Sequence, residues 1–515
     1  MDRYSYKKEE VTSVTDRTRP TIPKRMTTAL IHSLTAGVVP RIGLEHIAVG
    51  RKPEVEAILK DLANIGEGGA AFRIITGRYG SGKSFLLQMI RNYAMDRGFV
   101  VADADLSPER RLVGTKGQGL ATYRELMTHL SMRTKPDGGA LETILQRWIA
   151  SLQQGAMTEL GLALQDPMLE LEVERRIVSV TNTMQNMVHG FDFARVLSVY
   201  WRGYKLGEED MKQAALRWLR GEYATKTEAK QALSVGVIID DDNWYDYMKL
   251  WAEFVSMIGY QGLLLFIDEG VNLYKITNRI SRTSNYEKLL TMFNDTMQGK
   301  AEHLGIYMGG TPQFVEDERR GLFSYEALRS RLVQGRYAVE GYRNYTGPIL
   351  KLAMLSHEEI LILLQRLRDI HAMHEGYEAS LTDEQLVAFM QNAVGMLGAD
   401  EWLTPREVIR DFMDLLHTLR EHPETTFEQL LSSQPPAQRM VEDDLFTRTD
   451  ALDVATGETR ETGETREAGE VPTAENLYGN ESGAKGIGER RTRHEGEKEH
   501  SERDDVDDFL AEFEL

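Results

Sequence analysis

The stretch that most constrains this chain is Gly77-Arg78-Tyr79-Gly80-Ser81-Gly82-Lys83-Ser84, which has the pattern G-x-x-x-x-G-K-S. It follows the apolar run 72–76 and precedes a helical pattern that begins at Phe85. A strand, a glycine loop and a helix in this order are typical of a phosphate-binding loop. The alternative is a glycine-rich turn that matches by chance, and the correct flanks on both sides disfavour it.

The residue types in this stretch predict how it would bind a nucleotide. Glycines allow consecutive backbone N–H groups to turn inward around a triphosphate, and the N-terminus of the next helix adds partial positive charge. We expect Lys83 to reach the outer phosphates and the Ser84 hydroxyl to bind Mg²⁺. The predicted ligands are therefore ATP or ADP together with Mg²⁺.

Composition narrows the class of protein. A chain of 515 residues with 41% hydrophobic residues is expected to form two or three domains or subdomains. The absence of cysteine excludes disulfides and thiolate zinc sites, and it favours a reducing compartment. No segment approaches the roughly 18 consecutive apolar residues of a membrane span. We expect a soluble, cytoplasmic protein with no membrane partner.

The net charge of −19 is unevenly distributed. Residues 441–515 account for −14 of it, and residues 1–440 for only −5. The nearly balanced charge of residues 1–440 neither indicates a DNA-binding surface nor excludes a local one.

The hydrophobic pattern predicts an α/β fold. Buried strands are expected at 72–76, 98–103, 262–267 and 304–310, and helical periodicity dominates between the second and third of these. This predicts a parallel sheet with crossover helices. The predicted organisation is a flexible N-terminal arm (1–26), an ATPase core (27–347) with a helical insertion at about 115–258, a helical lid (348–432), a disordered acidic linker (433–504) and a terminal peptide (505–515).

The terminal peptide differs from the linker before it. Five apolar residues alternate with acidic residues and can form one short amphipathic helix: Val506, Phe509, Leu510, Phe513 and Leu515. One interpretation is a docking peptide that folds on a partner protein, and the other is a solvated end without function.

A carboxylate pair completes the predicted nucleotide site. Asp268 and Glu269 end the continuous apolar run 262–267. Beside a phosphate loop, Asp268 can hold the Mg²⁺ shell, while Glu269 can polarise the water that attacks the outer phosphate. Alone this pattern is weak, but combined with the upstream loop it predicts nucleotide binding and hydrolysis.

Two further segments have open interpretations. Val49-Gly50-Arg51 lies just before a helical pattern and either packs against the adenine or caps that helix. Thr311, at the tip of the strand 304–310, either lies between the acidic pair and the outer phosphate or is an ordinary strand-to-turn residue before Pro312.

Arg329 and Arg331 follow a helical stretch and lie two residues apart. In a ring or dimer, one of them would project into the nucleotide site of a neighbouring copy as an arginine finger. The alternative is that they are surface arginines paired with Glu316 or Glu318.

Together these features resemble an AAA+ ATPase of the origin-recognition branch. More narrowly, the chain resembles the BREX system ATP-binding family that includes BrxD, and the resemblance covers about 27–431. Four segments carry the narrower resemblance: 43–51, 105–112, 123–127 and 402–410.

The resemblance implies a bacterial anti-phage ATPase that acts beside helicases or DNA-modifying partners. It implies that Thr311 is a first sensor, that Arg329 or Arg331 is the finger, and that Arg406, at the start of a lid helix, is a second sensor. The 184 positions between Ser84 and Asp268 are more than a compact AAA+ core needs, which predicts the large insertion. No ordered winged-helix domain is expected beyond the lid, which puts duplex recognition by that route in doubt.

The insertion offers a possible DNA-binding surface. Basic residues alternate there with aromatics, as in a stacking and phosphate-contact surface, but the helical spacing favours a core position for the aromatics. The residues are Arg195, Tyr200, Trp201, Arg202, Tyr204, Lys205, Arg217, Trp218, Arg220, Tyr223, Lys226 and Lys230.

The sequence thus predicts a Mg-dependent ATPase that self-associates and couples turnover to assembly on DNA or with defence-system partners. The rival hypothesis is a nucleotide-gated scaffold with slow turnover that recruits a helicase or nuclease through its tail.

Overall fold

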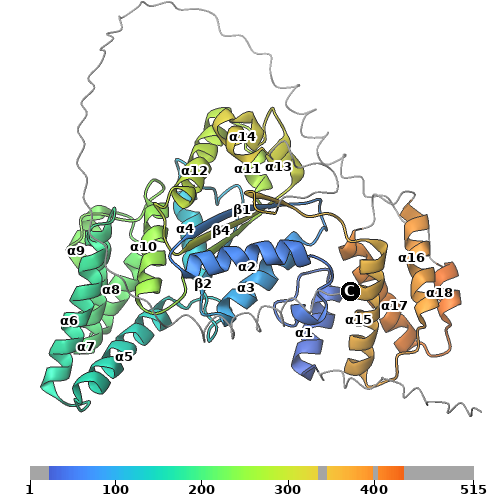
Figure 1. Ribbon diagram of the computed structural model, residues 1–515, viewed down its shortest axis with the longest axis horizontal. Coiled ribbons are helices and arrows are strands. Elements are labelled where there is room, and N and C mark those ends of the chain that lie inside the picture. Colours follow the sequence, from blue (N-terminus) through green and yellow to red (C-terminus); the bar gives the residue numbers. More distant parts are fainter. Residues whose placement is uncertain (1–21, 334–344, 398–403, 434–515) are drawn as a thin grey trace, which may run out of the picture.

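The computed structural model describes residues 22–333, 345–397 and 404–433. Most of the predicted N-terminal arm, the predicted linker beyond 433 and the predicted docking peptide lie outside these ranges. The described chain is an α/β protein with one five-stranded parallel sheet (Figure 1). The strands are β1 (Ala70–Thr76), β2 (Val100–Asp105), β3 (Leu263–Asp268), β4 (Leu304–Gly310) and β5 (Ile349–Lys351).

The strand order is β2-β3-β4-β1-β5, so β4 lies between β1 and β3. Because all pairs are parallel, the carboxyl ends of the strands lie at one edge of the sheet. The four strands predicted from apolar runs are confirmed, and β5 is an additional short edge strand. β2 continues two residues beyond the predicted end, to Asp105.

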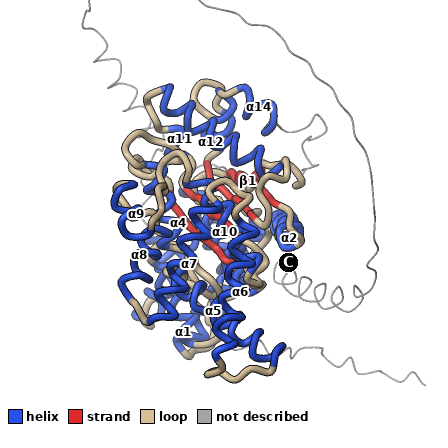
Figure 2. Tube along the Cα trace, turned by 90° about the vertical axis from the view of Figure 1, so that its left-hand side faces the viewer, coloured by secondary structure: helices blue, strands red, loops and turns tan. Residues whose placement is uncertain are grey.

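The sheet is buried on both faces. Phe72 and Ile74 of β1 point into one hydrophobic core, and Ala71 and Ile75 point into another, as the two-residue period of a strand requires. Figure 2 shows the strands enclosed by helices. The first face is covered by α4 (Gln118–Thr128), α10 (Trp244–Met257) and α12 (Arg279–Met297), and the second by α2 (Lys52–Gly66) and α3 (Lys83–Asp96).

Short helices follow β3 and β4 at the carboxyl edge of the sheet. They are α11 (Val271–Tyr274), α13 (Pro312–Glu316), the 3₁₀ turn η2 (Leu322–Ser324) and α14 (Glu326–Leu332). Another 3₁₀ turn, η1 (Leu44–His46), precedes α2.

A set of helices between β2 and β3, which we call the helical arm, extends from the sheet at the lower left of Figure 1. Apolar residues at helical spacing, such as Trp244, Met248 and Trp251 of α10, are buried and join the core of the first sheet face. Besides α10, the arm consists of α5 (Leu141–Leu160), α6 (Pro167–Met184), α7 (Gly190–Leu206), α8 (Glu209–Leu219) and α9 (Lys226–Leu233).

The C-terminal helices form a separate hydrophobic core, and we call them the lid. They are α15 (His357–Glu375), α16 (Asp383–Leu397), α17 (Pro405–Glu421) and α18 (Phe427–Ser433). Ser356 and Glu359 form a capping box that starts α15. The N-terminal helix α1 (Lys24–Thr35) packs on α15 and α17, so Leu30 and Leu34 belong to the lid core rather than to the cores of the sheet.

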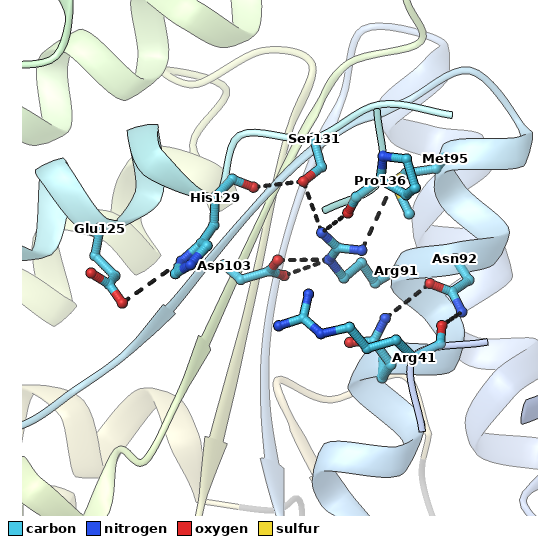
Figure 3. A network of polar contacts seen from close by, with 10 residues as sticks. Arg41, Arg91, Asn92, Met95, Asp103, Glu125, His129, Ser131 and Pro136 are labelled. Atoms are coloured by element: carbon cyan, nitrogen blue, oxygen red, sulfur yellow. Dashed lines mark hydrogen bonds and ion pairs between the residues drawn. The ribbon is translucent and has the colours of Figure 1, made fainter. Parts of the chain in front are cut away.

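A buried guanidinium links the helix after the phosphate loop to the chain that leads into the arm (Figure 3). Arg91 of α3 is 3% exposed and donates from Nε to both carboxylate oxygens of Asp103, at 2.9 and 2.7 Å. Its Nη2 donates to Ser131 Oγ and to the Pro136 carbonyl, each at 2.8 Å. Burial raises the pKa of Asp103, and Arg91 counteracts that rise. One side chain therefore joins α3, β2 and the chain before α5.

Candidate functional site at the carboxyl edge of the sheet

The predicted phosphate loop connects β1 to α3, as the sequence pattern requires. Gly80 and Gly82 have φ values of 78° and 89°, in the left-handed region that side chains disfavour. A Cβ atom on Gly80 would lie 2.6 Å from Cβ of Thr404, which caps α17 of the lid. The glycine therefore allows both the turn of the loop and the close approach of the lid.

Lys83 and Ser84 begin α3 and point in different directions. Lys83 Nζ donates to the carbonyls of Gly77 and Arg78, each at 2.9 Å, so its ammonium group lies over the loop. Ser84 Oγ donates to Asp268 Oδ2 at 2.7 Å. This hydrogen bond joins the two predicted nucleotide motifs across 184 positions of sequence.

The carboxylate pair lies at the end of β3. Asp268 Oδ1 accepts from the backbone N–H of Glu269 at 2.8 Å, and Glu269 has a left-handed φ of 58°. Partial burial raises the pKa of Glu269, and the charges of Asp268 and Asp105 raise it further, while Lys275 and Lys83 oppose the rise. A carboxylate with a raised pKa is suited to accept a proton from water.

Sequence reasoning missed Asp105. It ends β2, where its Cα is the register partner of Asp268. Burial raises the pKa of Asp105, and the Asp268 charge raises it further. The sequence signal was available, because Ala102-Asp103-Ala104-Asp105 alternates apolar and acidic residues and so continues the strand pattern beyond Asp103.

A cavity of about 810 Å³ contacts these groups. Its polar wall includes the loop residues Arg78 to Ser84, Asp268, Glu269 and Thr311. Its apolar wall comes from the end of α1 and the segment after it, from the start of α3, from the segment between β5 and α15, and from the lid: Leu34, Val38, Val39, Ile47, Val49, Phe85, Met354, Leu355, Leu363 and Ile409. A cavity with one polar and one apolar wall is suited to a ligand that has a charged part and a flat apolar part.

Val49 and Arg51 contact this cavity, while Gly50 packs against Glu359 of α15. Arg51 Nη2 donates to the Ser81 carbonyl at 2.9 Å and to the Ala353 carbonyl at 2.6 Å. Ser81 belongs to the phosphate loop, and Ala353 lies between β5 and α15. Arg51 therefore joins the loop to the chain that enters the lid.

Thr311 and Arg406 both contact the cavity. The Thr311 hydroxyl also accepts from the backbone N–H of Phe314 at 3.2 Å and so caps α13. Arg406, in the first turn of α17, donates to the Tyr79 hydroxyl, and its guanidinium lies 4.8 Å from the centre of the Tyr79 ring. The lid thus contacts the tip of the phosphate loop directly.

The two candidate finger residues lie elsewhere, on α14. Arg329 Nη2 is 2.7 Å from Glu318 Oε1, which is the pairing that the surface alternative predicted. Arg331 Nε donates to Asn294 Oδ1 at 3.0 Å. Neither arginine contacts the cavity of its own chain.

Of the two interpretations of the arm aromatics, the core position holds for four of the five, and Tyr204 is the exposed one, at 36%. Tyr200, Trp201, Trp218 and Tyr223 are all at most 6% exposed, because their helical spacing places them in the core. Several neighbouring bases form ion pairs, including Lys205 with Glu170, Arg217 with Glu228 and Arg220 with Glu222.

Neither a metal-binding group of three or more His, Cys, Asp or Glu residues nor a helix able to span a membrane occurs in the described parts of the chain. The oxygen atoms suited to Mg²⁺ are those of Ser84 and Asp268, because a hydroxyl and a carboxylate are ligands that this hard cation accepts.

Fold and site together define an α/β protein in which the predicted phosphate-binding loop lies beside a carboxylate pair at the edge of a parallel sheet. Within that class, residues 22–435 match the family model described as BREX system ATP-binding protein BrxC/D. The chain belongs to this family. A search of curated proteins finds no match.

Proposed function

We propose that this chain is an AAA+-type, Mg-dependent ATPase of a bacterial BREX-like anti-phage defence system, and that it couples ATP turnover to assembly on DNA or with helicase or DNA-modifying partners. Family membership supports ATP binding and the defence setting. The strand order supports the AAA+ class, because β4 separates the phosphate-loop strand from the Asp-Glu strand. The single observation that carries the proposal is the 2.7 Å hydrogen bond between Ser84 and Asp268.

Each residue of the site has a chemical role in this proposal. Lys83 exchanges its loop carbonyl partners for the outer phosphates, because phosphate oxygens bind an ammonium group more strongly than neutral carbonyls do. Ser84 and Asp268 would hold Mg²⁺, which would supply positive charge to neutralise the phosphate oxygens. Glu269 orients the attacking water and accepts its proton.

The remaining walls of the cavity bind the rest of the nucleotide. The apolar wall suits the adenine ring, and Val49 and Phe85 belong to it. Arg406 and Arg51 connect the lid to the phosphate loop, so a nucleotide on that loop biases the position of the lid. ATP turnover would in this way switch an assembly between two states. Arg329 or Arg331 would act on the nucleotide of a second copy.

Steady-state ATP hydrolysis and equilibrium ATP binding by the purified full chain test this proposal. Glu269→Gln is expected to keep ATP binding and to lower kcat by about 10²–10⁴-fold, since it removes the proton acceptor. Lys83→Ala is expected to weaken ATP binding. Glu287→Gln is the matched control, because Glu287 is an exposed carboxylate on α12 outside the cavity.

Equal loss of ATP affinity in Glu269→Gln and Lys83→Ala would contradict the assigned roles. A wild-type chain that binds ATP but turns over no faster than Glu269→Gln would contradict hydrolysis and favour the slow-turnover scaffold.

A further inference from the structure

Three arginines lie close together where α11, the start of α12 and the loop after α13 meet, because Arg282 feels the charges of Arg279 and Arg320. Arg319 is the exposed neighbour of Arg320 in the same loop. We call Arg279, Arg282, Arg319 and Arg320 the arginine cluster. Arg279 and Arg282 lie one turn apart on α12. Tyr286, in the next turn, donates its hydroxyl to the Arg320 carbonyl at 2.6 Å and so holds the loop against the helix. The cluster is therefore built by tertiary contacts between segments about 40 residues apart.

Arg282 is the buried member of the cluster. It is 8% exposed, and its Nη1 donates to two backbone carbonyls, those of Ile276 at 2.5 Å and Thr277 at 3.4 Å. Burial lowers the pKa of Arg282, and the charges of Arg320 and Arg279 lower it further. The Arg320 guanidinium lies 5.3 Å from the centre of the Tyr274 ring.

The three acidic residues just before Arg319 and Arg320 form no ion pair with the cluster. Glu316 pairs with Lys351, and Glu318 pairs with Arg329. Asp317 accepts from the Tyr274 hydroxyl and from the backbone N–H groups of Arg319 and Arg320. Within the described residues, no arginine of the cluster forms an ion pair with a carboxylate. Neighbouring guanidinium groups repel one another, and an anion bound between them would relieve that repulsion.

We propose that the arginine cluster binds the phosphate backbone of a nucleic acid. The planar fork of a guanidinium group matches phosphate oxygens, and two separate segments present several forks to a ligand with repeating negative charge. Ile280, between Arg279 and Arg282 in sequence, is 79% exposed and offers an apolar contact to a sugar or base. An acidic polypeptide would have no use for this contact, so it favours a nucleic acid.

The position of the cluster connects it to the nucleotide site. Only α11 and a short turn separate Glu269 from Arg279, and Lys275 of that turn contacts the nucleotide cavity. A strand bound at the cluster would therefore act on the segment that carries Glu269. This inference rests on the proposed function, which includes assembly on DNA, and it assigns the nucleic-acid contact to one surface; binding at the cluster itself requires no hydrolysis.

Fluorescence anisotropy with a labelled oligonucleotide, single-stranded in one series and duplex in the other, tests the proposal on the full chain. The test variant is Arg279→Glu/Arg319→Glu, which changes two exposed residues. The matched control is Arg202→Glu/Lys226→Glu, which changes two exposed residues of the arm and alters the net charge by the same amount.

The test variant is expected to bind the oligonucleotide at least about tenfold more weakly. For duplex, the slope of the logarithm of affinity against the logarithm of salt concentration should fall in magnitude by about 2, because two phosphate contacts are lost. The control variant should keep wild-type affinity. Comparison of the two series shows which form of nucleic acid supplies the phosphates.

Three outcomes would overturn the proposal. They are no binding by the wild-type chain, equal loss in both variants, and displacement of the oligonucleotide by polyglutamate at equal charge concentration, which would indicate an acidic polypeptide. Basal ATP hydrolysis, measured without nucleic acid, should be unchanged in the test variant. The two proposals can fail separately. If the wild-type chain hydrolyses no ATP, but only the test variant loses oligonucleotide binding, the ATPase proposal is refuted and the proposal for the arginine cluster stands.

Discussion

The carboxyl edge of the sheet and the helical arm use the same kinds of residue for opposite purposes. At the edge, polar side chains from distant elements meet in a cavity, as Ser84 and Asp268 do. In the arm, Trp218 is buried while its neighbour Arg217 forms an exposed ion pair with Glu228. The difference teaches that residue type does not identify a binding surface, because what matters is whether the fold has already supplied a partner.

Trp218→Ala should produce the largest effect on stability and so sharpen this comparison. The indole is 1% exposed, packs edge-on against Tyr247 with ring centres 5.2 Å apart, and donates to the Val237 carbonyl at 2.9 Å. Its removal should lower the free energy of unfolding by about 3–5 kcal/mol in a urea titration, with ATP binding retained.

Arg217→Ala is the control at the adjacent position. Its ion pair is exposed, so we expect a loss of no more than about 1 kcal/mol. Equal losses in the two variants would contradict the view that the arm uses its aromatics for packing.

The lid provides an intermediate case, in which a polar group is buried outside the nucleotide site. His371 is fully buried, its Nδ1 is 2.8 Å from the Tyr377 hydroxyl, and burial lowers its pKa from 6.5 to about 4. Between these values the unfolded chain binds more protons than the folded chain, so stability falls as the pH falls from about 6.5 to about 4. The loss should reach at most about 3 kcal/mol.

Urea titrations across this pH range check the lid prediction. His371→Gln should flatten the pH dependence of the free energy of unfolding, whereas His422→Gln, which changes a half-exposed ring, should leave it as in the wild type. Identical slopes in all three proteins would show that His371 does not carry the effect.

Arg406→Ala should have the smallest of these effects and tests whether the lid helps to form the site. Loss of the contact with Tyr79 should weaken ATP binding about tenfold, from the sum of one hydrogen bond and one cation–π contact. The change in ATP affinity is measured by equilibrium binding, with Glu269→Gln also present in each protein so that ATP is not hydrolysed during the measurement. Arg410→Ala, one turn later on α17 and outside the cavity, should bind ATP normally. Normal ATP affinity in both variants would show that this lid contact does not contribute to ATP binding.

Much of the site was predictable because its signals are local. The loop 77–84 and the pair Asp268 and Glu269 each follow a short buried strand, and strand, turn and helix preferences depend on neighbouring residues. Asp105 was missed because the predicted strand ended too early. The chemical roles of all the site residues stay predictions, since they depend on a bound nucleotide or, for Arg329 and Arg331, on a second copy.

Other features had no local signal. α1 lies far from the lid in sequence, yet it packs on α15 and α17, because its apolar stripe is buried only there. Arg91 and Asp103 are an unremarkable pair in sequence, but the crossover that places α3 against β2 brings their charges together.

The sequence by itself determined the family, the parallel α/β sheet, the phosphate loop and the carboxylate pair. Only the tertiary structure decided which charged groups have partners. It buried four aromatic side chains of the arm and brought Arg406 to Tyr79. It also gathered Arg279, Arg282 and Arg320 without an ion pair to any carboxylate of the described residues. The physical reason is that backbone preferences act over a few residues, while burial and charge pairing depend on contacts between segments far apart in the chain.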